Sequence, residues 1–280
     1  MKEETKVKKE KKPPYVRRLT NSYKKNKKTF IVFTILRIMV ILTAVRCAFT
    51  KNWESFATCI LVLILFLLPA LIEKWMDVSI PPLFQAIIFA FIFAAEILGE
   101  VDHYYVKIHG WDTMLHTING FLFAAVGFSL IYLLNRGSKN FNLSPFYLAL
   151  VAFCFSMTIG VLWEFFECSM DQFFNMDMQK DFIVQEINSV SLDPDNAGNV
   201  IHVKNIAETV VTTASGDTTT IKGYLDVGIL DTMKDLLVNL IGAVVFSTIG
   251  YLSLKKAKTS KVADSLMIRP NEKTEEEIRD

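Results

Sequence analysis

Six long apolar runs constrain the fold of this 280-residue chain more than any other feature. A run of about 20 apolar residues forms a helix that crosses a hydrocarbon core of roughly 30 Å. Because lipid offers the backbone no hydrogen-bond partners, such runs adopt helices that satisfy their own N–H and C=O groups. The predicted helices cover residues 29–49, 54–74, 80–98, 113–134, 145–167 and 235–254. The sequence therefore predicts an all-α integral membrane protein, a six-transmembrane-helix bundle.

Tryptophan and proline residues agree with these boundaries. Four tryptophans stand near predicted helix ends, where an interfacial aromatic belt would place them. They are Trp53, Trp75, Trp111 and Trp163. Pro82 opens the third helix and Pro145 opens the fifth, where a missing N–H is harmless. Pro69 lies deep in the second run and predicts a kink there, or the last turns of that helix.

Lysine and arginine are distributed unevenly, and this distribution orients the helices. They crowd residues 1–28, and the last helix is followed by Lys255, Lys256, Lys258 and Lys261. The 135–144 loop adds Arg136 and Lys139, whereas the short loops on the other side carry only Lys51 and Lys107. Cytoplasmic flanks carry the excess of lysine and arginine. We therefore expect a multi-pass protein of the cell (cytoplasmic) membrane with both termini in the cytoplasm.

This orientation divides the chain into five segments. We expect a basic cytoplasmic tail at 1–28, five transmembrane helices over 29–167, an extracytoplasmic loop at 168–234, the sixth helix at 235–254 and a second cytoplasmic tail at 255–280. Within the loop, residues 200–206, 210–213 and 218–221 are β-prone, and Ser215-Gly216-Asp217 is a turn sequence. The loop is expected to form a small β-rich meander that caps the outer face.

Acidic and histidine side chains stand one helical turn apart where three of the apolar runs meet a polar flank. The pairs are Asp112 with His116, Glu164 with Glu167, and Asp231 with Asp235. Asn119, Asp171 and Asn239 extend the three pairs at helical spacing, so each pair is part of a polar stripe on one helix face. Ionisable groups at membrane depth are costly unless they are paired or hydrated. We therefore expect the three stripes to face one another at the outer ends of their helices, with Gly120, Gly127, Gly160 and Gly242 allowing close packing.

Each polar residue also has a purely structural interpretation. Asp112 and Asp231 can cap the helices that they begin, and an acidic residue suits the dipole there. His116, Asp235 and Asn239 lie deeper, where the alternative role is an interhelical hydrogen bond worth about 0.6 kcal/mol in membranes.

Glu164 and Glu167 are predicted to end their helix, where the dipole disfavours anions. A cation must then compensate them, either Arg46 at the outer end of the first helix or a bound ion. One imidazole with several carboxylates suits Mn²⁺, Zn²⁺, Mg²⁺ or Fe. We predict a divalent metal held by Asp112, His116, Glu164 and Asp235. The candidate catalytic residues are Glu164, Glu167, Asp235 and Asn239.

The sequence is compatible with three classes of function, and the sequence does not decide whether the protein is an enzyme. The leading hypothesis is a site, reachable from membrane lipid, that binds or processes a lipid-linked or envelope substrate with the help of the metal. Arg46 would contact a phosphate of that substrate. The alternatives are an ion- or proton-coupled transporter and a non-catalytic envelope scaffold. The chain contains no phosphate-binding loop and no Gly-x-Ser-x-Gly or His-Glu-x-x-His motif, and we expect no nucleic-acid partner.

Several of these residues carry a resemblance to a known family. The segments are Gly110-Trp111-Asp112 with His116, Trp163-Glu164-Phe165-Phe166-Glu167, and Asp231-Thr232 with Asn239-Leu240-Ile241-Gly242. They resemble the YjdF-like family of uncharacterised bacterial inner-membrane proteins and, more distantly, the VanZ-like proteins. The resemblance covers the third to sixth helices. It implies a role in the cell envelope or its lipids and supplies no mechanism.

Overall fold

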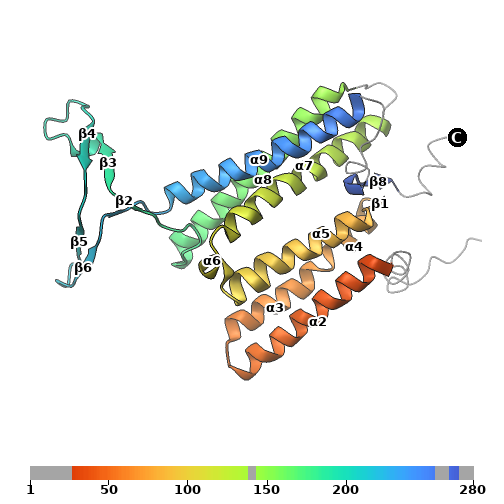
Figure 1. Cartoon of the computed structure of the whole chain (residues 1–280), viewed down its shortest axis with the longest axis horizontal. Helices are drawn as coiled ribbons and strands as arrows, with labels where there is room; N and C mark the ends of the chain where they lie inside the picture. The colour runs from red at the N-terminus through yellow and green to blue at the C-terminus, as the bar shows by residue number, and fades with distance from the viewer. Residues whose placement is uncertain (1–26, 138–142, 256–264, 271–280) are drawn as a thin grey trace, which may run out of the picture. The chain divides into compact units, whose positions relative to one another are not determined.

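A computed structural model describes residues 27–137, 143–255 and 265–270 of the chain. Within them, six helices are long and apolar enough to cross a membrane: Lys27–Phe49, Trp53–Trp75, Pro82–Val101, Trp111–Asn135, Pro145–Phe174 and Ile229–Lys255. Figure 1 shows these helices and the short strands that come between the fifth and sixth of them in the sequence. The predicted class, an all-α integral membrane protein with six spans and a small β-containing insertion, is confirmed. Residues 1–26, Lys139, Lys256, Lys258 and Lys261, on which the predicted orientation depends, lie outside the described residues.

The chain divides into two compact units, and three of its helices run through both. The first unit comprises Met1–Leu115, Phe128–Ala149 and Ile249–Asp280, and the second comprises His116–Gly127 and Leu150–Thr248. Helices α7 (Trp111–Gly137), α8 (Pro145–Phe174) and α9 (Ile229–Lys255) are the three shared helices.

Aromatic rings fill the core of the first unit. It is built from α2 (Lys27–Phe49), α3 (Trp53–Leu65), α5 (Pro82–Ile92) and the π-helix η1 (Phe93–Val101). The rings of Phe33, Phe66 and Phe89 form a closed triangle, with centroids 5.0–6.0 Å apart. Each ring meets its neighbours at a tilt, the arrangement that the ring quadrupoles favour. Apolar packing therefore makes up the core between these helices, and a hydrogen bond from the Thr29 hydroxyl to the Pro82 carbonyl at 3.0 Å adds a polar tie between α2 and α5.

Proline interrupts the second span as predicted. The span consists of α3 and α4 (Leu68–Trp75), separated at Phe66-Leu67, and Pro69 lies in the first turn of α4. The missing proline N–H is tolerated there because first-turn N–H groups have no partner within the helix. Glu73 then ties α4 to α5, since its Oε1 accepts hydrogen bonds from the Ile80 N–H at 2.8 Å and from Gln85 Nε2 at 2.9 Å. The buried Gln85 is thus satisfied structurally.

Three other short elements complete the first unit. A single helical turn, α6 (Tyr104–Lys107), precedes α7. Strands β1 (Val78–Ser79) and β8 (Arg269–Pro270) pair antiparallel. The Ala94 carbonyl of η1 accepts a hydrogen bond from Trp111 Nε1 at 3.3 Å, which ties the start of α7 to this helix.

Glycines set the packing of the helices in the second unit, as predicted. A Cβ at Gly120 would lie 2.0 Å from the backbone oxygen of Asn239, and one at Gly242 would lie 2.1 Å from that of Thr117. Helices α7 and α9 therefore touch backbone to backbone. The hydroxyl of Ser156 on α8 donates to the Gly120 carbonyl at 2.7 Å, so the third helix joins at the same level.

Helices α8 and α9 extend further than the apolar pattern predicted. Helix α8 continues seven residues past the expected end and stops where Asn175 adopts a left-handed conformation (φ 54°), a common way to end a helix. Helix α9 starts at Ile229, before the expected 235. The Asp226 carboxylate accepts hydrogen bonds from the N–H groups of Gly228 and Leu230, which fixes that start. Trp163 consequently lies within α8 and not at its end.

The insertion between α8 and α9 contains three antiparallel strand pairs. They are β2 (Ile183–Val184) with β7 (Tyr224–Leu225), β3 (Glu186–Ser189) with β4 (Ile201–Lys204), and β5 (Thr209–Thr212) with β6 (Thr218–Ile221). A short 3-10 turn, η2 (Val190–Leu192), follows β3. The predicted strands and turn are present, but the described strands pair two by two. The expectation of one continuous meander was therefore wrong.

Candidate functional site

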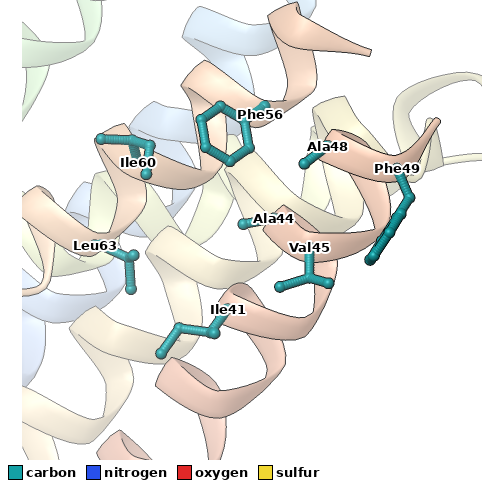
Figure 2. A pocket seen from close by; sticks show the side chains of 8 residues that line it. All are labelled: Ile41, Ala44, Val45, Ala48, Phe49, Phe56, Ile60 and Leu63. Carbon is teal, nitrogen blue, oxygen red and sulfur yellow. The ribbon is translucent and has the colours of Figure 1, made fainter. Parts of the chain in front are cut away.

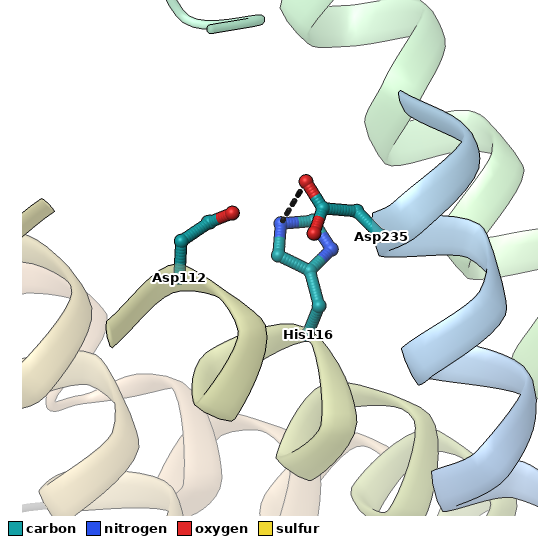
Figure 3. Close-up of side chains that lie close together, drawn as sticks. All are labelled: Asp112, His116 and Asp235. Carbon is teal, nitrogen blue, oxygen red and sulfur yellow. Dashed lines mark ion pairs between the residues drawn. The ribbon is translucent and has the colours of Figure 1, made fainter. Parts of the chain in front are cut away.

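His116 lies between two carboxylates in the second unit. Its Nδ1 is 3.8 Å from Glu164 Oε1, and its Nε2 is 3.9 Å from Asp235 Oδ2. Figure 3 shows the His116–Asp235 pair, with Asp112 one helical turn before His116 on α7. The side chains of His116, Glu164 and Asp235 are all buried, with at most 8% of their residue surface exposed. Both distances exceed the length of a direct hydrogen bond.

One oxygen of the Glu164 carboxylate stands out among these groups. Its Oε2 is buried and has no hydrogen-bond partner among the described residues. Gln179 and Thr232 lie beside this carboxylate, and Gln179 Nε2 donates to Thr232 Oγ1 at 2.5 Å. An orphaned buried carboxylate oxygen is costly. It therefore points to a cation or a proton that completes the site.

Glu167 completes the acidic face of α8. It follows Glu164 by one turn and is also buried. The indole Nε1 of Trp163 donates to Glu167 Oε1 at 2.8 Å, which fixes the direction of that carboxylate. Because α8 continues to Phe174, neither glutamate is at a helix C-terminus. The prediction that the negative end of the helix dipole destabilises these two carboxylates was therefore wrong.

Lys234 supplies positive charge on the α9 side of the cluster. Its Nζ lies 2.6 Å from Asp231 Oδ1 and 3.5 Å from Asp235 Oδ1. The other oxygen of Asp231 accepts a hydrogen bond from the Lys180 N–H at 2.9 Å. Asp231 thus links the segment after α8 to the first turn of α9.

The segment that follows α8 folds back onto the second unit. The Asp171 carboxylate accepts hydrogen bonds from the N–H groups of Met178 and Gln179, at 2.6 and 2.8 Å. This turn brings the Gln179 side chain to Thr232 on α9. The segment therefore supplies a neutral polar group next to the glutamates.

Asn239 connects three helices next to the acidic cluster. It is 1% exposed, and its Oδ1 accepts a hydrogen bond from Asn119 Nδ2 at 3.4 Å. Its own Nδ2 reaches the Ser156 carbonyl at 3.5 Å, and it lies against the bare Cα of Gly160. These contacts give Asn239 the structural role that was its alternative interpretation; its predicted catalytic role stays a prediction.

The described residues include two groups that could hold a metal ion by their chemistry. In the group formed by His116, Glu164 and Glu167, one ligand atom from each residue lies within 4.8 Å of the others, and all three residues are buried. The second group consists of Asp112, His116 and Asp235, and Asp112 stands one turn before His116 on α7. The possibility of a divalent metal is therefore supported by geometry, while the predicted assignment of individual ligands stays a prediction.

Some sequence candidates lie elsewhere. Arg46 belongs to the first unit, where its Nη2 is 2.7 Å from Asp102 Oδ1. Its guanidinium, which was expected to compensate the glutamates or to contact a phosphate, is therefore paired with Asp102. Sequence reasoning gave no role to Lys234, Gln179 or the indole of Trp163. Lys234 was recognisable, because it stands between Asp231 and Asp235 at the start of a membrane helix.

The apolar pocket of the first unit is a poor candidate for chemistry. It has a volume of about 410 Å³ and is lined by apolar side chains of α2 and α3. Figure 2 shows these side chains, among them Ile41, Phe49, Phe56 and Leu63, and all of their atoms are carbon. A groove lined by apolar side chains on membrane helices suits contact with hydrocarbon.

The family comparison agrees with this architecture. Residues 29–256, most of the chain, match the family model described as "Predicted membrane protein (DUF2238)". The chain belongs to this family. No curated protein and no solved structure matches it. The match begins and ends with the first and last membrane helices, and it includes every residue of the acidic cluster.

Proposed function

We propose that this member of the DUF2238 family binds a divalent metal ion in its buried acidic cluster and uses it on a lipid headgroup or a lipid-linked substrate. The observation that carries the proposal is the charge of the second unit. Four buried carboxylates, from Glu164, Glu167, Asp231 and Asp235, face one lysine and one imidazole. With all four carboxylates ionised and His116 protonated, these six described groups carry a net charge of −2. Buried charge without compensation is costly, and a divalent cation removes the excess.

The depth of the cluster supports a lipid substrate. Asp235 lies six residues after the start of α9, about 9 Å along the helix axis. We take the start of α9 as the level at which this span meets the lipid headgroups, and a headgroup or a lipid-linked group is then the substrate class nearest to the cluster. With the orientation expected from the basic flanks, this is the outer leaflet of the cell membrane.

The cluster contains the parts that metal-assisted hydrolysis or transfer requires. A bound divalent ion lowers the pKa of its water and polarises a phosphoryl or carbonyl oxygen. A carboxylate that does not bind the ion can accept the proton from that water. Asp112, His116, Glu164, Glu167 and Asp235 are the residues proposed to share these tasks. The resemblance to YjdF-like and VanZ-like proteins supports an envelope role.

An ion- or proton-coupled transporter is the second candidate. One observation favours it: polar groups lie one turn further along α7 and α9, where Asn119 donates to Asn239 and Asn239 donates to the Ser156 carbonyl. A carrier would load its cation at His116 and Glu164 and pass it along this path. Flux of protons or divalent ions through vesicles containing the purified protein would support this function over hydrolysis.

Metal analysis of the purified full chain in detergent tests the proposal. We expect about one divalent ion per chain in the wild type, and loss of that ion in His116→Ala. Asp217→Asn, a change in the exposed turn between β5 and β6, serves as the matched control and retains the ion. A wild type that binds no Mn²⁺, Zn²⁺ or Fe²⁺ overturns the proposal. A His116→Ala strain with an unchanged envelope phenotype supports the scaffold alternative.

A further inference from the structure

We infer that the metal ion sits on the Nδ1 side of His116, held by His116, Glu164 and Glu167, while Asp235 and Lys234 act from the Nε2 side as positioning residues. This inference rests on the proposed metal function and assigns its ligands. It differs from the set expected on sequence, in which Asp235 was a ligand and Glu167 was not.

The Nδ1 side has the better ligand set. His116, Glu164 and Glu167 are all buried, and their ligand atoms lie within 4.8 Å of one another. The Nδ1–Oε1 distance of 3.8 Å needs to shorten only slightly, since ligand atoms around an ion at about 2.1 Å are roughly 3.0–3.4 Å apart. Glu164 Oε2 is buried and has no hydrogen-bond partner among the residues described, so this oxygen is available to the ion while Gln179 and Thr232 stay beside the carboxylate.

The Nε2 side is suited to orienting the ring. A metal-bound histidine almost always donates its other N–H to a carboxylate or carbonyl, which fixes the tautomer. Asp235 Oδ2, at 3.9 Å from Nε2, is placed for that acceptor role. Its other oxygen lies 3.5 Å from the Lys234 ammonium. An ion bound directly to Asp235 would be repelled by that ammonium, whereas an ion across the ring is further from it.

Neighbouring groups orient the two glutamates in a similar way. The Trp163 indole holds Glu167 through a 2.8 Å hydrogen bond to Oε1. Gln179 and Thr232 lie beside the Glu164 carboxylate. Three protein ligands leave coordination positions open for water or substrate, which is the pattern of a catalytic ion. Two carboxylates with one imidazole favour Mn²⁺, Fe²⁺ or Zn²⁺ over softer ions.

Titration of the purified full chain with Co²⁺ tests this assignment, because the d–d absorption of Co²⁺ reports the number and geometry of its ligands. Glu164→Gln and Glu167→Gln should each change the band shape and weaken binding by more than 100-fold. Asp235→Asn should keep the band shape and weaken binding about 10–100-fold, the usual effect of losing an orienting partner. Lys234→Met should keep the band shape too, with a smaller loss. Size-exclusion profiles and thermal unfolding verify that each variant folds.

The outcomes separate this inference from the proposed function. Unchanged Co²⁺ affinity and spectrum in Glu167→Gln, with binding abolished in Asp235→Asn, would place the ion on the Nε2 side and overturn the assignment. The metal function itself would survive that result. No binding of Co²⁺, Mn²⁺ or Zn²⁺ to the wild type would remove both. Should a glutamine variant fail to fold, Glu164→Asp or Glu167→Asp replaces it, and an unchanged spectrum there counts equally against the assignment.

Discussion

The two units of this protein solve helix packing in different ways. The first unit fills the space between its helices with phenylalanine rings, and the Phe33–Phe66–Phe89 triangle contains no polar atom. In the second unit, Gly120 and Gly242 have no side chains, so helices α7 and α9 touch along their backbones. Asn239 of α9 also accepts a hydrogen bond from Asn119 of α7. Ring packing tolerates small adjustments, whereas backbone contact and buried polar pairs require one geometry. A site that must hold ligands in fixed positions belongs on the second kind of scaffold.

The largest expected difference concerns the glycines. Gly120→Ala should cost about 3 kcal/mol or more, because its Cβ meets the Asn239 carbonyl oxygen, which belongs to the backbone and cannot rotate away. In the first unit, a Cβ at Gly99 meets only the Tyr105 ring, which can turn. We expect Gly99→Ala to cost about 1 kcal/mol. Thermal unfolding in detergent measures both, and equal losses would show that the two units pack with the same tolerance.

Exchange of a core residue for leucine should give the next largest difference. Phe89→Leu keeps an apolar core and should cost less than about 1.5 kcal/mol. Asn239→Leu, similar in size, leaves the amide of Asn119 without its acceptor and should cost about 1–3 kcal/mol. Unfolding in mixed micelles compares the two variants. If the double variant Asn119→Leu/Asn239→Leu is no more stable than Asn239→Leu, the cost does not come from the broken pair.

The smallest expected effect concerns the insertion between α8 and α9, which is held neither by packed phenylalanine rings nor by backbone contact between helices. Asp193 accepts hydrogen bonds from the N–H groups of Asn199, Ala197 and Asp195, and these bonds hold its pKa below the usual value near 3.8. The folded turn binds its proton less readily than the unfolded one. Its contribution is therefore complete above pH 3.8 and is lost as the pH falls through the lowered pKa.

NMR of the labelled full chain can follow this titration. The amide shifts of Ala197 and Asn199 should change with a midpoint below pH 3.8, and Asp193→Asn should abolish that transition. A midpoint at or above 3.8 would mean that the N–H groups do not stabilise the carboxylate. The helices of both units should keep their signals throughout.

Much of the architecture could be predicted because each helix is specified locally. The length of the apolar runs gave six spans, and Pro69 gave the break between α3 and α4. The ends of α8 and α9 could not be predicted from hydropathy, because polar residues continue both helices beyond the apolar pattern. Those ends depend on side-chain bonds to distant backbone, such as the one from the Phe182 N–H to Asp226.

The sequence alone determined that the chain has six membrane-spanning helices and that acidic and histidine side chains lie on one stripe of each of three helices, because periodicity and composition act within a helix. Only the tertiary structure decided which of those side chains meet. It brought Glu164 and Asp235 to opposite sides of His116, gave Lys234 to the α9 carboxylates and left Arg46 with Asp102. Contacts of this kind depend on how closely and at what rotation helices pack, and in the second unit that was set by backbone contact at Gly120 and Gly242.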